Sequence, residues 1–204
     1  TKLKLSQFSG ISLKKYTTLI MVSGSYNQLG KDEVKKIKKW VEEGNTLITV
    51  AGGSNWAISK KLINESLVES KKDSTHSRKN YVDASEFIGR ERIGGVILKA
   101  DIDLTHPIAF GYNDNSIPVY KNNNVFINKT KNDYSSVATY SKDFHIDGYI
   151  SESNKKDFIP GAASLIISKV GSGRVVVFAD NPNFRGTWYG TNKLFLNAIF
   201  LGNN

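Results

Sequence analysis

Ser54 is the residue whose type and position first suggest chemistry. It follows the apolar, β-rich start of the segment TLITVAGGSNWAISKKL, Thr46–Leu62, and precedes a helical pattern. A sharp strand-to-helix turn lifts the side chain at its apex clear of the sheet, and the N–H groups of the helix N-terminus can stabilise an oxyanion. The G-x-S-x-G pattern of a nucleophile elbow is not met, because Trp56 stands where the second glycine is needed. A serine before a helix is also a common N-cap, and the local sequence favours this interpretation.

An attacking serine needs a base, and three histidines could serve: His76, His106 and His145. His76 lies in a polar stretch. His106 precedes a proline, a setting that favours a hydrogen bond between the imidazole and its own loop. His145 has Asp143 and Asp147 two residues away on either side, and on a strand all three would share one face. These carboxylates could orient the imidazole, but the same pattern is typical of a charged surface.

No metal site is expected in this chain. It has no cysteine, so thiolate ligands and disulfides are excluded. A zinc peptidase site uses a His-x-x-Glu pair with a later histidine. The residues three positions after the histidines are Lys79, Ala109 and Gly148.

The segment NPNFRGTWYGTN offers a second kind of site. Arg185 stands among Phe184, Trp188 and Tyr189, a composition suited to stacking a guanidinium on aromatic rings or gripping a carboxylate. The alternative is a packed corner in which carbonyls and aromatic faces hold Arg185 inside the fold, and this interpretation is favoured.

Composition predicts one domain, 1–204, because 204 residues with 39% hydrophobic content can bury one sizeable core. The chain begins with Thr1, so we expect a fragment of a longer protein. It has no signal-like start and no run near the roughly 18 apolar residues of a membrane span. The net charge of +9 comes mostly from lysines that are dispersed along the chain, which favours a solvated surface over nucleic-acid binding.

The elements that must position these residues alternate between strands and helices. An unbroken apolar run, Tyr16–Gly24, predicts a strand buried on both faces in the centre of a sheet. A helix is expected over 31–43, a second buried strand over 46–53, and a second helix from Ser54 to Asn64. This order with short connections predicts βαβ units and an open, mostly parallel α/β sheet.

The later elements are less regular. Residues 65–93 are polar and predict a surface excursion, 94–102 a strand, 103–120 a loop-rich insert, and 124–129 and 136–141 short strands. Two apolar runs joined by Gly171-Ser172-Gly173 predict a C-terminal antiparallel β-hairpin over 163–180. A final helix is expected over 189–202.

The segment GSGRVVVFADNPNFRGTWYGTNKLFLNAIFLG, Gly171–Gly202, resembles the end of the class I glutamine amidotransferase-like domain found at the C-terminus of a group of bacterial zinc carboxypeptidases. TTLIMVSG, WVEEGNTLITVAGGSNWAIS and THPIAFGY extend the resemblance over most of the chain. It implies a flavodoxin-like, three-layer α/β sandwich.

The resemblance also implies that catalysis has been lost. Active amidotransferases of this fold carry a cysteine at the elbow and a His-Pro-Glu in the late turn, whereas the matching positions here are Ser54 and Asn181-Pro182-Asn183. A serine hydroxyl needs a base, and an asparagine amide cannot take its proton. Ser54, Asn181 and Asn183 are therefore expected to be degenerate triad positions.

The resemblance implies a catalytically inactive accessory domain of an exported zinc carboxypeptidase, secreted or periplasmic. It would serve stability, positioning or substrate contact. Its partner would be the peptidase domain of the same polypeptide, with a peptide substrate as a further candidate, and zinc would belong to that peptidase domain. Two alternatives stay open: a small serine hydrolase using Ser54, or a binding module for anionic or glycan ligands. Candidate binding residues are Arg185, Trp188, Tyr189 and His106.

Overall fold

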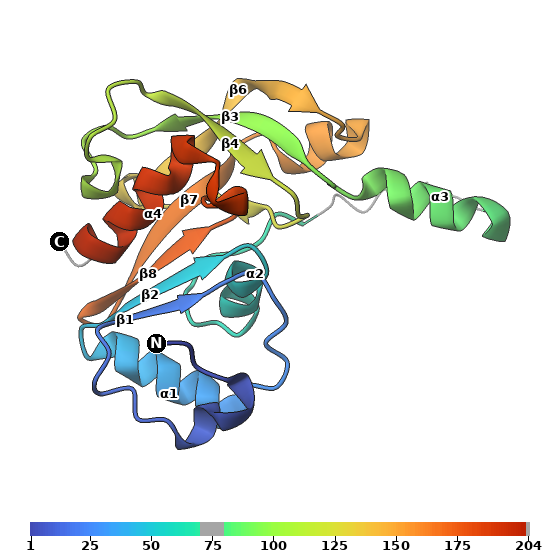
Figure 1. The fold of residues 1–204 in the computed structure, drawn as a ribbon. Coiled ribbons are helices and arrows are strands. Elements are labelled where there is room, and N and C mark those ends of the chain that lie inside the picture. Colours follow the sequence, from blue (N-terminus) through green and yellow to red (C-terminus); the bar gives the residue numbers. More distant parts are fainter. Residues whose placement is uncertain (70–79, 203–204) are drawn as a thin grey trace.

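The computed structural model describes residues 1–69 and 80–202. One twisted sheet runs through the molecule, with helices on both of its faces (Figure 1). Helices α1 (Lys31–Glu42) and α2 (Gly52–Ser59) pack with the side chains of Leu47 and Val175 on one face. Helix α4 (Tyr189–Leu201) packs with Ile48 on the other face. The predicted three-layer, flavodoxin-like α/β sandwich is confirmed.

The sheet is mixed. Its strand order is β1-β2-β8-β7-β6-β3-β4. The short strand β5 is outside this order and pairs with β7. Among the strands of the described residues, only β1–β2 and β2–β8 are parallel pairs. The expectation of a mostly parallel sheet is therefore not exact. Between β3 and β8 the chain forms only short 3-10 and π segments, and strands joined without a crossover helix run antiparallel. The strands are β1 (Thr18–Met21), β2 (Thr46–Val50), β3 (Val96–Ile102), β4 (Ser116–Lys121), β5 (Ile127–Asn128), β6 (Ser136–Gly148), β7 (Ala162–Val170) and β8 (Gly173–Phe178).

Strand β1 lies at an edge of the sheet, so its predicted central position is wrong. Ile20 is 38% exposed and Val22, just beyond the strand, is 61% exposed. An apolar run indicates what a strand can pack against, but it does not say whether a second strand will lie beside it. Here part of that apolar surface lines a groove, which is described below.

The other predicted elements at the two ends of the chain are confirmed, with shifted boundaries. Helix α1 buries Ile37, Trp40 and Val41, and Gly44 follows it at a φ of 109°. Helix α2 begins two residues before Ser54 and ends at Ser59, five residues earlier than expected. The β7–β8 hairpin and α4 form as predicted.

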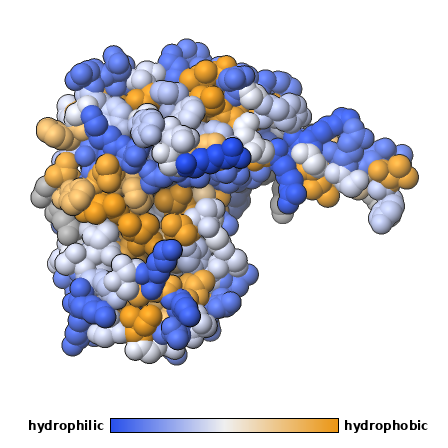
Figure 2. Space-filling view, viewed as in Figure 1, coloured by the Kyte–Doolittle hydropathy of each residue, from blue (hydrophilic) through white to orange (hydrophobic). Residues whose placement is uncertain are grey.

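The middle of the chain differs most from expectation. The polar stretch 65–93 contains helix α3 (Tyr81–Glu91), which buries no residue and stands clear of the body (Figures 1 and 2). Strand β4 forms inside the predicted loop-rich insert, and β6 spans 13 residues where a short strand was expected. Register shifts let β6 bend along β3 and β7.

Candidate functional site

A strained turn connects β2 to α2 at the carboxyl end of the parallel strands. Ala51 forms this turn with φ 48° and ψ −107°, a backbone conformation that residues with a Cβ rarely adopt. The two glycines after it allow a close approach of the loop that follows β1. A Cβ at Gly53 would lie 2.5 Å from the Met21 carbonyl oxygen, and one at Gly52 would lie 2.8 Å from that of Gly24. The chain therefore forms an elbow, and its apex is Ala51, which is 1% exposed.

Ser54 lies inside this elbow rather than at its apex. It is the third residue of α2 and is 0% exposed. Its hydroxyl donates to the Phe178 carbonyl oxygen at 2.7 Å and lies 3.0 Å from the Thr49 hydroxyl. Two expectations are thereby corrected: Ser54 neither occupies the apex nor caps the helix. Ser54 lies three residues after Ala51, and its side chain points back to the sheet. Its hydrogen bond to Phe178 links α2 to β8.

A buried polar cluster lies where β8 ends. Asp180 Oδ1 accepts a hydrogen bond from the Tyr140 hydroxyl at 2.8 Å and lies 3.2 Å from Lys121 Nζ. The Ser164 hydroxyl donates to Asp180 Oδ2. Lys121 is 0% exposed, and its Nζ also donates to the Val125 carbonyl oxygen at 2.6 Å. These contacts join the end of β4 and the interiors of β6 and β7 to the residue Asp180, which lies just beyond the end of β8.

The electrostatics of this cluster favour a structural role. Burial lowers the pKa of Lys121, and the Asp180 carboxylate opposes this effect. Burial, followed by the same carboxylate, raises the pKa of Tyr140 well above its usual range, so Tyr140 stays a neutral donor. The cavity beside Ser164, Asp180 and Asn181 has a volume of about 10 Å³. It has room for about one water molecule and none for a substrate.

The late turn brings Asn181 and Asn183 together. The Asn183 N–H donates to Asn181 Oδ1 at 3.2 Å, and the Asn181 N–H donates to the Tyr120 carbonyl oxygen at 3.2 Å. Asn183 Oδ1 is buried, with no hydrogen-bond partner among residues 1–69 and 80–202. The hydroxyl of Ser54 bonds to Phe178, three residues before this turn, and not to either amide. Neither amide can act as a base at neutral pH.

The corner around Arg185 differs from its favoured interpretation. Arg185 is exposed at a φ of 52°, and its guanidinium carbon lies 5.2 Å from the centre of the Phe184 ring. The expectation that carbonyls hold it inside the fold is wrong. The aromatic residues do pack: Phe184 stacks on Tyr120 with ring centres 3.7 Å apart, and Trp188 Nε1 donates to a β4 carbonyl oxygen at 3.3 Å. Tyr189 is exposed.

His106 bonds to its own loop, as predicted. Its Nδ1 accepts from the Ile108 N–H at 3.1 Å, and half-burial of the ring lowers its pKa. This bond requires an unprotonated Nδ1.

His145 is not oriented by the two neighbouring aspartates. Its Nε2 lies 2.8 Å from the Gly148 carbonyl oxygen. Asp143 pairs with Lys99 at 2.8 Å, and Asp147 accepts from the Gly148 N–H. His76 lies outside the described residues.

Sequence reasoning missed the residues that define this region: Ala51, Lys121, Tyr140 and Asp180. One usable signal was Asp180, which directly follows the apolar run VVVFA. A second was Lys121, which ends SIPVYK, an alternating pattern that is typical of a strand. In the described part of the chain, no three His, Asp or Glu side chains are grouped to hold a metal ion. No helix among those residues is long and apolar enough to cross a membrane.

Comparisons with known proteins support the fold. No family model matches the chain, and no curated protein matches it. A cytoplasmic protein from Salmonella typhimurium is similar in structure, with a TM-score of 0.54, 13% identity, and coverage of 97% of this chain and 74% of that one. PurLQS from Thermotoga maritima gives a TM-score of 0.54 and 15% identity, with 94% of this chain and 82% of that chain covered. At these identities the likeness shows the fold alone, which is a flavodoxin-like α/β sandwich.

Proposed function

We propose that this chain is a non-catalytic amidotransferase-like domain. The observation that carries the proposal is the elbow, whose strained apex holds the methyl group of Ala51 and no nucleophile. Strained strand-to-helix turns of this kind present the nucleophile in related hydrolytic folds. The apex is also buried, so a substrate carbonyl would not reach it.

The remaining side chains near the elbow support the same conclusion. Ser54 is buried and its hydroxyl donates a hydrogen bond to a main-chain oxygen, and the late turn offers amides where a base is needed. Removing the base from a catalytic unit costs several orders of magnitude in rate. A serine hydrolase that uses Ser54 is therefore not favoured.

We further propose that the domain is an accessory part of an exported zinc carboxypeptidase, secreted or periplasmic. The resemblance of residues 171–202 to the C-terminal domain of such enzymes supports this step. Its partner is then the peptidase domain of the same polypeptide, which holds the zinc. The accessory domain contributes stability, positioning or substrate contact.

The catalytic part of the proposal is tested with the purified chain. We expect no ammonia release from glutamine above the buffer rate, and no labelling of Ser54 by a fluorophosphonate probe. Because the chain has no cysteine, Ser54→Cys gives a clean second readout. Its thiol should react with iodoacetamide only after unfolding in urea. Turnover or probe labelling that disappears in Ser54→Ala would overturn the proposal.

The parent enzyme is tested on the longer protein. We expect a His-x-x-Glu sequence upstream, one zinc per polypeptide, and release of C-terminal residues from peptides. Removal of residues 1–204 should lower the thermal midpoint of the peptidase or raise its KM. A longer protein without zinc and without peptidase activity would reject the proposal of a carboxypeptidase parent. It would not affect the proposal that this domain is non-catalytic, which is based on the elbow.

A further inference from the structure

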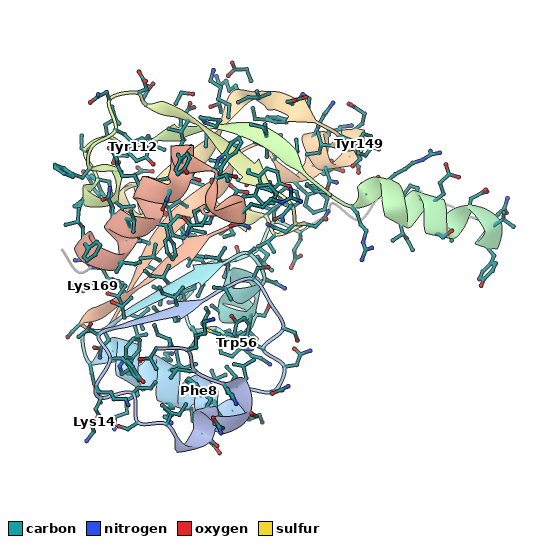
Figure 3. All side chains as sticks on the ribbon, in the orientation of Figure 1. Phe8, Lys14, Trp56, Tyr112, Tyr149 and Lys169 are labelled. Carbon is teal, nitrogen blue, oxygen red and sulfur yellow. The ribbon has the colours of Figure 1, made fainter. Side chains whose placement is uncertain are left out.

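The open edge of β1 borders a groove in the surface of the molecule. This groove has a volume of about 720 Å³ and is lined by residues 1–3, Leu5, Phe8, Tyr16, 18–26, Leu29 and Ile37. The N-terminus lies beside β1 in Figure 1, and Phe8, labelled in Figure 3, lies on the α1 side of the sheet. Binding pockets commonly have volumes of roughly 300–1,000 Å³. The groove is therefore large enough for a short segment of chain.

The backbone of β1 is arranged to accept another strand. The Thr46 N–H donates to the Thr17 carbonyl oxygen, and Thr18 is in register with Thr46. In a parallel pair, alternate residues turn both backbone groups toward the partner strand. The N–H and C=O groups of Thr18 and Ile20 consequently face away from β2, toward the open edge. Within residues 1–69 and 80–202, β1 pairs with β2 alone.

The charge around the groove is positive. No Asp or Glu is among its lining residues, whereas Lys2 is. Two further ammonium groups lie over lining rings: Lys15 Nζ is 5.2 Å from the centre of Tyr16, and Lys36 Nζ is 5.3 Å from that of Phe8. These charges disfavour a second copy of this chain as the occupant, because two such edges would bring like charges together.

We propose that the β1 edge binds an extended peptide segment of another polypeptide, with alternating apolar residues and acidic flanks. The segment adds as a strand to β1, where the main-chain groups of Thr18 and Ile20 supply hydrogen bonds. Its apolar side chains enter the groove, and its acidic flanks meet Lys2 and Lys15. This proposal does not rest on the proposed function, because none of these residues belongs to the elbow.

The test uses a fluorescein-labelled peptide, Glu-Asp-Val-Thr-Val-Thr-Val-Asp-Glu, measured by fluorescence anisotropy. We expect it to bind at least tenfold more tightly than the same peptide with lysine flanks. A third peptide, N-methylated at alternate residues to remove the N–H groups that would face β1, should lose binding at least tenfold. Hydrogen exchange of the Thr18 and Ile20 amides should slow when the acidic peptide is bound.

Matched variants locate the site. Ile20→Pro removes an outward N–H and no bond to β2, and proline is tolerated at such edge positions. It should weaken binding at least tenfold, whereas Ile20→Val should not. Lys2→Glu combined with Lys15→Glu should also weaken binding. Lys142→Glu combined with Lys169→Glu changes the net charge equally but lies outside the groove lining, and should have a smaller effect.

Three results would each overturn the proposal. The first is no detectable binding of the acidic peptide at concentrations up to about 1 mM. The second is equal binding by the N-methylated peptide, which would indicate simple filling of an apolar pocket. The third is a concentration-dependent dimer that Ile20→Pro abolishes, which would identify a second copy as the occupant.

Discussion

Replacing Lys121 with methionine tests whether the buried polar cluster around Asp180 stabilises the fold. Methionine keeps the length of the side chain and its packing near Phe126, whose ring centre lies 4.6 Å from Lys121 Nζ. The substitution leaves Asp180 charged and buried, with hydroxyl donors but no cation, and removes the donor to the Val125 carbonyl oxygen. Breaking a buried ion pair on one side costs about 3–5 kcal/mol. In a chain of this size the thermal midpoint should then fall by roughly 6–20 °C.

A double-mutant cycle measures the interaction between Lys121 and Asp180 separately from their contacts with other residues. Lys121→Met and Asp180→Asn should each lower the free energy of unfolding, but together they should cost less than the sum of the single costs by at least about 1.5 kcal/mol. Urea unfolding followed by circular dichroism at pH 7 measures all four proteins. Lys99→Met, which removes the cation of an exposed pair with Asp143, is the control and should leave the urea midpoint unchanged. The structural role would be refuted if the losses in unfolding free energy caused by the two single substitutions were additive. It would also be refuted if Lys121→Met lowered the free energy of unfolding by less than about 1 kcal/mol.

Three further predictions follow from the contacts. Ser54→Ala should cost about 1 kcal/mol in urea unfolding, because the Phe178 carbonyl oxygen keeps the Ala51 N–H as donor; a much larger loss would contradict this account. Arg185→Ala should leave the thermal midpoint nearly unchanged, whereas Trp188→Ala should lower it; equal effects would argue against an exposed Arg185. Because the folded-state pKa of His106 lies below its unfolded value, its contribution to stability should fall as pH drops through about 6.5. His106→Asn, which keeps an acceptor but does not titrate, should lack this decline when unfolding free energies are compared from pH 8 to 5.

The ends of the fold were predictable because their patterns are local. The spacing of Ile37, Trp40 and Val41 marks one face of a helix, and the two apolar runs around Gly171 mark a hairpin. The position of β1 was not predictable in this way, since an apolar run is compatible with either an edge or a central strand. Helix α3 was missed because it lies in a polar stretch and buries nothing.

The candidate site was only partly predictable, and the reason is physical. A search by residue type selects Ser54, but the apex of an elbow is defined by backbone angles, and Ala51 gives no chemical signal in the sequence. The cluster of Lys121, Tyr140 and Asp180 joins residues 40 and 59 positions apart along the chain. Periodicity within one element carries no information on such contacts.

Packing around the turn maintains the strained backbone of Ala51. Gly52 and Gly53 hold the start of α2 against the main chain at the end of β1, where no Cβ fits beside the Met21 and Gly24 carbonyl oxygens. The same segment, 21–24, lines the groove beside β1. One stretch of backbone therefore supports both the elbow and the groove. The shape of the β1 edge depends on this strained turn, because relaxing the turn would move the wall of the groove.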